Sequence, residues 1–263
     1  GSYNTGIGRS ALQSNTTASD NTAVGASALA ANTTGTRNVG VGKQALLVAT
    51  TGNDNVAVGF VAADSLTTAS NTTAIGSWAL AGNTTGANNT AVGYRAAYSN
   101  TTGYHLTASG MNSLYNNTTG GSNVAVGYAS GSSNTTGSNN VFVGDSASAS
   151  NTTGNSNTAL GFQSLTANTT ASNNTAVGYQ ASYSNTTGID NTSLGMNTLR
   201  TNTTGTQNTA VGKNALYTGT GTYNTAVGFN AGSDITTGSK NTILGRYTGN
   251  QGGLDIRTTS NNI

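Results

Sequence analysis

The chain contains no cysteine, no proline and no glutamate, and only 6% of its 263 residues are charged. Without cysteine, neither a disulfide nor a thiolate metal site can hold the fold together. The formal charge is only +2 and the basic residues are scattered, which argues against an electrostatic surface for nucleic acid. No apolar run approaches the ~20 residues of a membrane-spanning helix, so we expect no membrane insertion. Disordered chains usually carry more charge and more proline, so the composition also argues against disorder.

What the sequence does contain is one short repeat. Its most regular residue is a glycine that closes the string Asn-Thr-Ala-Val-Gly, and we number repeat positions from this anchor glycine. Successive anchors are 17 residues apart, except for one spacing of 16 between the copies of Gly212 and Gly228. The fifteen anchors are Gly8, Gly25, Gly42, Gly59, Gly76, Gly93, Gly110, Gly127, Gly144, Gly161, Gly178, Gly195, Gly212, Gly228 and Gly245.

The residues before each anchor predict a short β-strand. Position −1 is Val, Ile or Leu in every copy except Ser109, position −2 is mostly Ala, and position −3 is always Thr or Val. β-Branched residues favour strands, and their period of two places positions −3 and −1 on one face and position −2 on the other. We expect the larger side chains to face the core and the alanines to form a smooth outer face.

A second apolar column follows four residues after the anchor, as in Leu29, Leu80 and Leu165, and it predicts a second short strand. The string Asn-Thr-Thr-Gly, as at 83–86, supplies the turn residues between copies. Another Asn column precedes the first strand, and stacked Asn side chains can form amide ladders. A helix is excluded because the sequence has no 3.6-residue apolar stripe and is rich in Gly, Asn and Thr.

Together these columns predict an all-β fold, a parallel β-solenoid or β-roll of about fifteen 17-residue coils. We expect the array over residues 1–249 and a transition segment over 250–263 that leads out of it to a further C-terminal region. The residue missing from the short copy falls between Leu216 and Asn224, in a turn, where its loss would not shift the strand register.

Each coil offers few large apolar side chains, so a lone solenoid is poorly stabilised. We therefore expect a homo-oligomer in which the smooth Ala and Ser face of each chain packs against its partners, with a shared-axis trimer as the first choice. A monomeric solenoid is the alternative.

The segment Asn-Thr-Ala-Val-Gly-x-x-Ala-Leu resembles the head repeat of YadA-type trimeric autotransporter adhesins, over residues 4 to about 249. The resemblance implies a left-handed parallel β-roll packed as a trimer, although the adhesin repeat is shorter and lacks a regular Asn-Thr-Thr-Gly insert. The longer repeat is similar to those of tail-fibre proteins of marine bacteriophages, often cyanophages. The segment 249–263 also resembles the part that leaves the repeat array in such fibres.

One column of large residues, at position +1, is a candidate contact surface. Aromatic rings there could stack on sugars, or they could cover a seam between chains or coils. Its aromatic members are Phe60, Tyr94, Tyr128, Phe162, Tyr179 and Phe229. Lys and Arg occupy the same position in other copies, and Trp78 and Tyr98 invite the same two interpretations.

Each of the other candidate sites has a simple structural explanation. His105 is the only histidine, so a catalytic triad or a His-based metal site lacks its side chains, and we expect a surface substitution there. The Asp residues lack the dense calcium pattern of some β-helix repeats. The Asn-Thr-Thr strings match the N-glycosylation acceptor but are also turn chemistry. Ice binding would need Thr on an exposed flat face, whereas we expect the strand Thr column to share a face with the core.

We therefore expect a structural protein without enzyme activity, cofactor or metal. The leading hypothesis is a shaft or adhesive segment of a trimeric phage tail fibre on the virion, presenting a receptor-binding tip to a host-surface glycan or protein. The first alternative is a bacterial cell-surface adhesin or glycosylated extracellular filament. The second is a monomeric ice- or glycan-binding solenoid.

Overall fold

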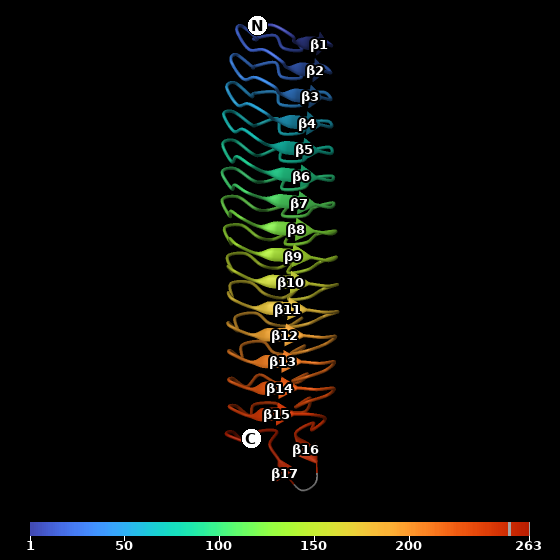
Figure 1. The fold of residues 1–263 in the computed structure, drawn as a ribbon, viewed down its shortest axis with the longest axis vertical. Coiled ribbons are helices and arrows are strands. Elements are labelled where there is room, and N and C mark those ends of the chain that lie inside the picture. The colour runs from blue at the N-terminus through green and yellow to red at the C-terminus, as the bar shows by residue number, and fades with distance from the viewer. Residues whose placement is uncertain (252–253, 263) are drawn as a thin grey trace. The chain divides into compact units, whose positions relative to one another are not determined.

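The computed structural model of the chain describes residues 1–251 and 254–262, and these form an all-β structure without a helix. The residues divide into two compact units, Gly1–Thr136 and Gly137–Ile263. Each unit is a parallel β-solenoid with one three-residue strand per repeat, which confirms the predicted fold class (Figure 1). Paired strands are offset by one repeat, as in Thr90↔Thr107 and Ala91↔Ala108.

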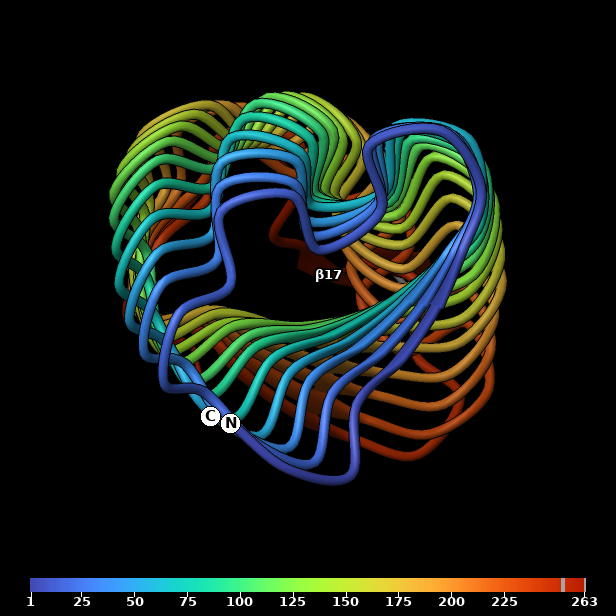
Figure 2. The ribbon, with the colours of Figure 1, turned by 90° about the horizontal axis from the view of Figure 1, so that it is seen from above.

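The first unit contains eight strands: β1 (Thr5–Ile7), β2 (Thr22–Val24), β3 (Val39–Val41), β4 (Val56–Val58), β5 (Thr73–Ile75), β6 (Thr90–Val92), β7 (Thr107–Ser109) and β8 (Val124–Val126). The second contains β9 (Val141–Val143), β10 (Thr158–Leu160), β11 (Thr175–Val177), β12 (Thr192–Leu194), β13 (Thr209–Val211), β14 (Thr225–Val227), β15 (Thr242–Leu244), β16 (Asn250–Gln251) and β17 (Leu254–Asp255). Within each unit, successive coils follow the same winding path around a common interior (Figure 2).

The strands face the opposite way from our expectation. Position −2 points inward, so that Ala91 is completely buried, whereas Val92 at position −1 is 38% exposed. In coils with Leu at position +4, the Leu column and the buried Asn columns fill the interior, and only a small side chain lies beneath the sheet. A Cβ built on Gly6, at position −2, would lie 3.7 Å from Leu12 Cδ1, which shows how closely the two columns approach.

The predicted second strand is absent from the described residues, and turns take its place. Leu80 and its equivalents have positive φ, 51° for Leu80, which directs the side chain into the core. The backbone N–H groups of this turn form hydrogen bonds with the neighbouring coils. Leu80 N–H donates to Ala96 C=O at 2.9 Å, and Trp78 N–H donates to Phe60 C=O at 3.0 Å. These backbone hydrogen bonds go alternately to the next and to the preceding coil. They take the place of a β-ladder and stabilise the positive-φ conformation.

The anchor glycine has a different requirement, because it lies directly against the next anchor. Gly93 has φ of 135°, and a Cβ there would lie 2.7 Å from the carbonyl oxygen of Gly110. Only glycine fits such a close approach of two backbones.

Both Asn columns form ladders, although an amide ladder was predicted only for the column before the strand. That column bonds from side chain to backbone, and the amide-to-amide ladder occurs in the Asn-Thr-Thr-Gly column. In the column that precedes the strand, Asn21 Oδ1 accepts from the backbone N–H of Asn38 at 2.9 Å. In the Asn-Thr-Thr-Gly column, Asn117 Nδ2 donates to Asn100 Oδ1 at 2.9 Å and Asn134 Nδ2 donates to Asn117 Oδ1 at 2.7 Å. These side chains are fully buried, and their hydrogen bonds compensate the cost of burial.

The short repeat behaves as predicted. β13 and β14 keep the same register as every other pair, with Thr209 opposite Thr225, so the deletion is absorbed in the turn before Asn224. Gly219 takes the place of the ladder Asn in this turn, and the Asn202 amide is therefore the last rung of that ladder.

Described residues of the predicted transition segment pack against the last coil. Ile256 is 2% exposed and packs with Ile235 and Ile243. Arg257 C=O accepts from the N–H groups of Thr236, Thr237 and Gly238, which are the bonds that a further coil would provide. Residues 254–262 therefore cap the β15 coil.

Candidate functional site

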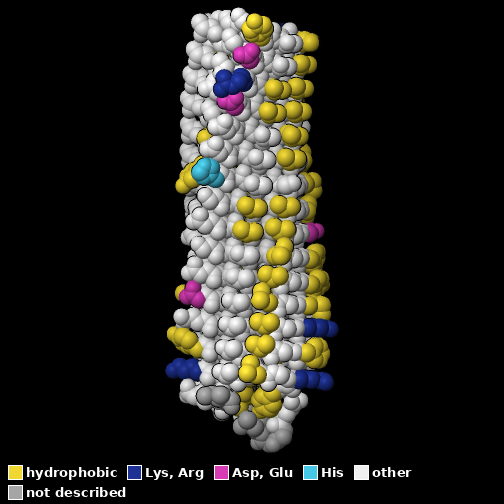
Figure 3. All heavy atoms as spheres, viewed as in Figure 1, with side chains coloured by type: hydrophobic (Ala, Val, Ile, Leu, Met, Phe, Trp, Pro, Cys, Tyr) yellow, Lys and Arg dark blue, Asp and Glu magenta, His cyan; other side chains and the backbone are white. Residues whose placement is uncertain are grey.

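The outer face of the sheet in each unit consists of positions −3 and −1 and carries exposed apolar side chains. Hydrophobic side chains form vertical rows on this face (Figure 3). At position −1 the members that are clearly exposed are Ile7, Val58, Ile75, Val92, Val126, Leu160, Leu194, Val227 and Leu244. Neither position carries a charged side chain in any copy. This "outer apolar row" reverses the prediction that Ala and Ser columns form the outer face.

The predicted aromatic column at position +1 lies beside that row and is exposed throughout. Phe60, Tyr94, Tyr128, Phe162, Tyr179 and Phe229 are all 42–49% exposed. Phe162 and Tyr179 come from successive coils and stack at 5.4 Å between ring centroids. Lys43 Nζ lies 5.8 Å from the Phe60 ring, and Arg246 Cζ lies 5.4 Å from the Phe229 ring. The column is thus a row of rings with cations at intervals, available for contact.

A second group of aromatic residues lies in the turns at positions +2 and +5. Trp78 contacts both Phe60 and Tyr98 edge-on, at 5.4 and 6.1 Å between centroids. Tyr98 stacks on Tyr115 of the next coil at 5.3 Å with an angle of 7° between planes. Arg95 lies over the rings of Tyr94 and Tyr98, at 5.0 and 5.7 Å.

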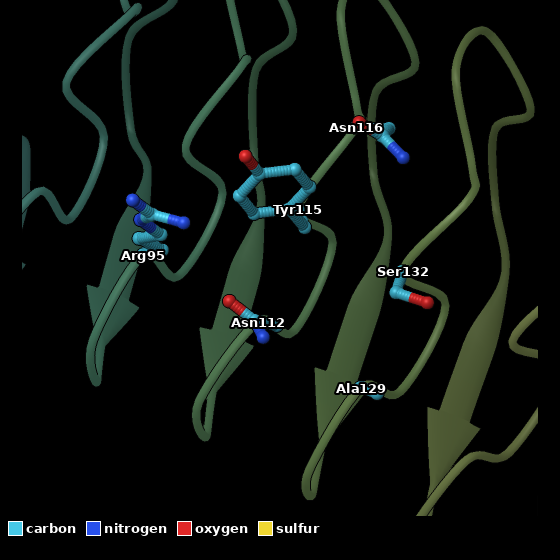
Figure 4. Close-up of a pocket in the computed structure, with 6 residues that line it drawn as sticks. All are labelled: Arg95, Asn112, Tyr115, Asn116, Ala129 and Ser132. Carbon is cyan, nitrogen blue, oxygen red and sulfur yellow. The ribbon is translucent and has the colours of Figure 1, made fainter.

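The stack ends at a recess of about 250 Å³ beside Tyr115, shown in Figure 4. Its lining comes from three successive coils: Arg95, Asn112, Tyr115, Asn116, Ala129 and Ser132. The column that carries Tyr98 and Tyr115 continues with the small Ser132, so the face of Tyr115 that is turned away from Tyr98 is left uncovered by a ring. We call this the Tyr115 recess.

A similar recess of about 340 Å³ occurs in the second unit, lined by Asn214, Tyr217, Thr218, Asn230, Ser233 and Asp234. It again pairs a Tyr at position +5 with a Ser in the next coil. Arg200 lies beside Tyr217 but outside this lining, and its Nε donates to Gln180 Oε1 at 3.1 Å while its Nη1 donates to the Tyr217 hydroxyl at 3.4 Å. The lining of the recess also includes the exposed carboxylate of Asp234.

The sequence did not identify these recesses. Positions +2 and +5 are filled by different residue types in different copies, and neither column is conspicuous alone. The 17-residue spacing between Tyr98 and Tyr115 was the available signal, because it predicts that the two rings stack.

The other residues singled out in the sequence are a histidine at the surface and a column of asparagines. His105 is exposed and contacts Tyr104 edge-on at 5.1 Å, as expected of a surface position. Among the described residues, no three acidic, His or Cys side chains lie together as metal ligands, and no helix is long and apolar enough to cross a membrane. Except for the partly buried Asn15, the Asn residues of the Asn-Thr-Thr-Gly column have fully buried side chains, as in Asn100, whose amide donates to Gly103 C=O, so they are inaccessible to glycosylation in the folded chain.

Charged groups are few, and their effects are local. Arg37 and Asp54, one coil apart, form an exposed ion pair at 2.6 Å, whose hydrogen bond lowers the pKa of Asp54. Burial raises the pKa of Asp64. Hydrogen bonds from Arg257 lower the pKa of Asp255, in the cap, to about 2. None of these carboxyl groups lies in an arrangement typical of general acid–base catalysis.

Comparison with known proteins gave no match to a protein-family model, to a curated protein or to a solved structure.

Proposed function

We propose that this chain is a structural segment of a homotrimeric extracellular fibre, of the kind formed by phage tail fibres, and that its outer apolar row is the surface on which the chains pack. The observation that carries the proposal is the row itself. A soluble chain rarely leaves aligned Val, Ile and Leu side chains exposed in coil after coil unless another surface covers them.

The composition of the row favours a permanent contact between chains. Position −1 is apolar in nearly every copy and position −3 is Thr or Val, so both are free of charge. Interfaces of obligate homo-oligomers are depleted of charge in the same way. The number of three chains comes from the resemblance of the repeat to trimeric adhesin heads.

The fibre would work mechanically. Backbone hydrogen bonds between coils and the two Asn ladders couple each coil to its neighbours, which resists bending and local unfolding. Such a shaft would hold a receptor-binding tip away from the virion. A bacterial surface adhesin would use the same architecture, whereas glycosylation at the Asn-Thr-Thr-Gly column is disfavoured by the burial of its amides.

The test is the mass of the chain in solution by light scattering, measured over a dilution series. We expect a mass near three chains that persists on dilution. The double variant Val58→Lys/Val92→Lys places two charges on the outer apolar row, and we expect it to be monomeric. Thr51→Lys/Thr85→Lys has the same spacing but lies in exposed turns, and it should remain trimeric. A wild-type chain that is monomeric at all concentrations would rule out the trimer for this segment.

Ice binding is a second candidate, because the strand Thr column faces outward. Thr90 and Thr107 are exposed and paired across adjacent strands, contrary to the expectation that this column shares a face with the core. Thermal-hysteresis activity of the wild type tests this candidate. Activity in the wild type would favour ice binding, and its absence at high protein concentration would eliminate it.

A further inference from the structure

We propose that the Tyr115 recess binds an acidic oligosaccharide, one whose sugar rings carry carboxylate groups. The site is distinct from the outer apolar row, and its existence does not depend on the fibre proposal. It is built from an open aromatic face, a cation with an unused donor and an amide with an unused acceptor.

The first element is the interrupted stack. Tyr98 covers one face of Tyr115, and the small Ser132 follows in the same column one coil later. Because coils are spaced by about one strand separation, ~4.8 Å, a flat ring that continued the stack would sit on Tyr115 above Ser132 and Ala129. The apolar face of a sugar ring suits this place, since Tyr combines an apolar surface with a polar hydroxyl.

The second element is a pair of polar atoms without partners. Arg95 Nε and Asn112 Oδ1 are buried, and neither has a hydrogen-bond partner among the described residues. A buried polar atom without a partner is costly, so a ligand that supplies one gains affinity. Both atoms are shielded from solvent, so a ligand contacts them only when the Arg95 and Asn112 side chains turn toward the recess. There the Asn112 amide oxygen would accept from a sugar hydroxyl, and the Arg95 guanidinium would donate to a carboxylate.

The positions of these groups set the size of the ligand. Arg95, Asn112 and Ser132 come from three successive coils, and Asn112 lies between the other two in Figure 4. Arg95 belongs to the coil before Tyr115, whereas the open face of Tyr115 points toward the coil after it, that of Ser132. A single sugar ring on that face cannot also reach Arg95. The recess therefore fits an oligosaccharide that lies along the coils, with one ring on Tyr115 and a carboxylate at Arg95.

The recess of the second unit provides an internal comparison. There the neighbouring Arg200 guanidinium lies outside the lining and already has protein acceptors, and the lining includes the carboxylate of Asp234. Both differences should weaken the binding of an anionic ligand. We therefore expect acidic saccharide to bind beside Tyr115 and not beside Tyr217.

The test is isothermal titration of the full chain with an oligogalacturonate and with its neutral methyl ester. Each variant introduces a residue that already occurs at the same repeat position in another coil, so we expect the fold to be retained. Tyr115→Ser copies Ser132, Arg95→Gln copies Gln44, and Tyr217→Ser is the matched control in the other recess. Circular dichroism and solution mass, compared with the wild type, check that each variant is folded and assembled alike.

We expect saturable binding of the oligogalacturonate, weakened about tenfold or more by Tyr115→Ser and by Arg95→Gln. Arg95→Gln should also remove the preference for the acid over the ester, and Tyr217→Ser should leave binding unchanged. Absence of saturable binding, equal binding of acid and ester by the wild type, or binding insensitive to Tyr115→Ser would each overturn the proposal. None of these outcomes bears on whether the chain is trimeric.

Discussion

Asn117 and Asn100 lie one coil apart, and the amide of Asn117 donates to Oδ1 of Asn100 at 2.9 Å inside the core. The same amide also donates to Gly120 C=O at 2.9 Å, and Asn117 Oδ1 accepts from Asn134 at 2.7 Å. One side chain therefore satisfies buried groups of three coils. In a protein with so few large apolar residues, this polar ladder is a main source of cohesion between coils.

Replacing the Asn117 side chain should destabilise the fold. Asn117→Ala leaves the groups of Asn100, Gly120 and Asn134 without that partner, and each buried unpaired group costs about 1–3 kcal/mol. We expect the free energy of unfolding to fall by about 3 kcal/mol or more, measured by chemical denaturation, with faster amide exchange in the adjacent coils. Asn116→Ala, at the exposed neighbouring position, should change stability by less than about 0.5 kcal/mol. Equal effects of the two substitutions would contradict a structural role for the ladder.

In two coils a large residue at position −2 occurs together with a small residue at position +4. The coil of Gly144 has Phe142, fully buried, where most coils have Ala, and it has Ser148 where most have Leu. The coil of Gly245 repeats the exchange with Ile243 and Gly249. No coil has a large residue at both positions, although some, such as the coil of Gly93 with Ala91 and Ala97, have a small residue at both. In the coils of Gly144 and Gly245 we expect the two side chains to occupy the same interior space.

A double-mutant cycle tests this expectation. Phe142→Ala should cost about 3–5 kcal/mol by leaving a cavity. Ser148→Leu alone should cost about 1–3 kcal/mol by overpacking, although it removes a buried hydroxyl that lacks a partner among the described residues. The double variant restores the usual Ala and Leu and should be close to the wild type in stability. Additive effects of the two substitutions would show that the positions do not share space.

The sequence predicted the coil and its period but not which strand face is buried. A three-residue alternation is the same pattern whichever face is inside, and side-chain size favours burying Val92 instead of Ala91. The structure instead buries position −2, and in coils with Leu at position +4 the interior is already filled by Leu and Asn from the turns. The Asn ladders, by contrast, were predictable, since identical residues one coil apart must stack.

The turns were less predictable for a different reason. Leu80 adopts a φ of 51°, which is uncommon for a residue other than glycine, so local preference points to a strand there. Only hydrogen bonds to the coils on both sides stabilise this conformation. The Tyr115 recess depends on the same turns, because they bring positions +2 and +5 of successive coils together.

Two carboxyl groups should give opposite pH dependence. Burial raises the pKa of Asp64, so its contribution to stability is fully present below about 3.9, the unfolded pKa, and is lost as the pH rises through the folded pKa. The hydrogen bond with Arg37 lowers the pKa of Asp54, so its contribution is present above the unfolded pKa and is lost as the pH falls through the folded pKa.

Thermal melting at pH 7 and at pH 3 distinguishes them. Asp64→Asn should raise the melting temperature relative to the wild type at pH 7 and lose that advantage at pH 3. Asp54→Asn should lower it at pH 7 by a small amount, because the ion pair is exposed, and converge on the wild type at low pH. Differences of the same sign for both variants would contradict the assignment.

The cap of the β15 coil should control the stability of the end of the second unit. Ile256 fills the space beneath Ile235 and Ile243, and the adjacent Arg257 carbonyl accepts three backbone N–H groups of the 236–238 turn. Ile256→Ala should cost about 2–5 kcal/mol locally and release those N–H groups to solvent. We expect amide exchange to accelerate strongly at residues 236–238 and at Thr242, and much less around β9. Arg257→Ala keeps the backbone carbonyl and removes only an exposed ion pair with Asp255, so it should leave exchange at 236–238 nearly unchanged. Exchange that is equally fast in both variants would mean that the ion pair, and not the buried isoleucine, holds the cap.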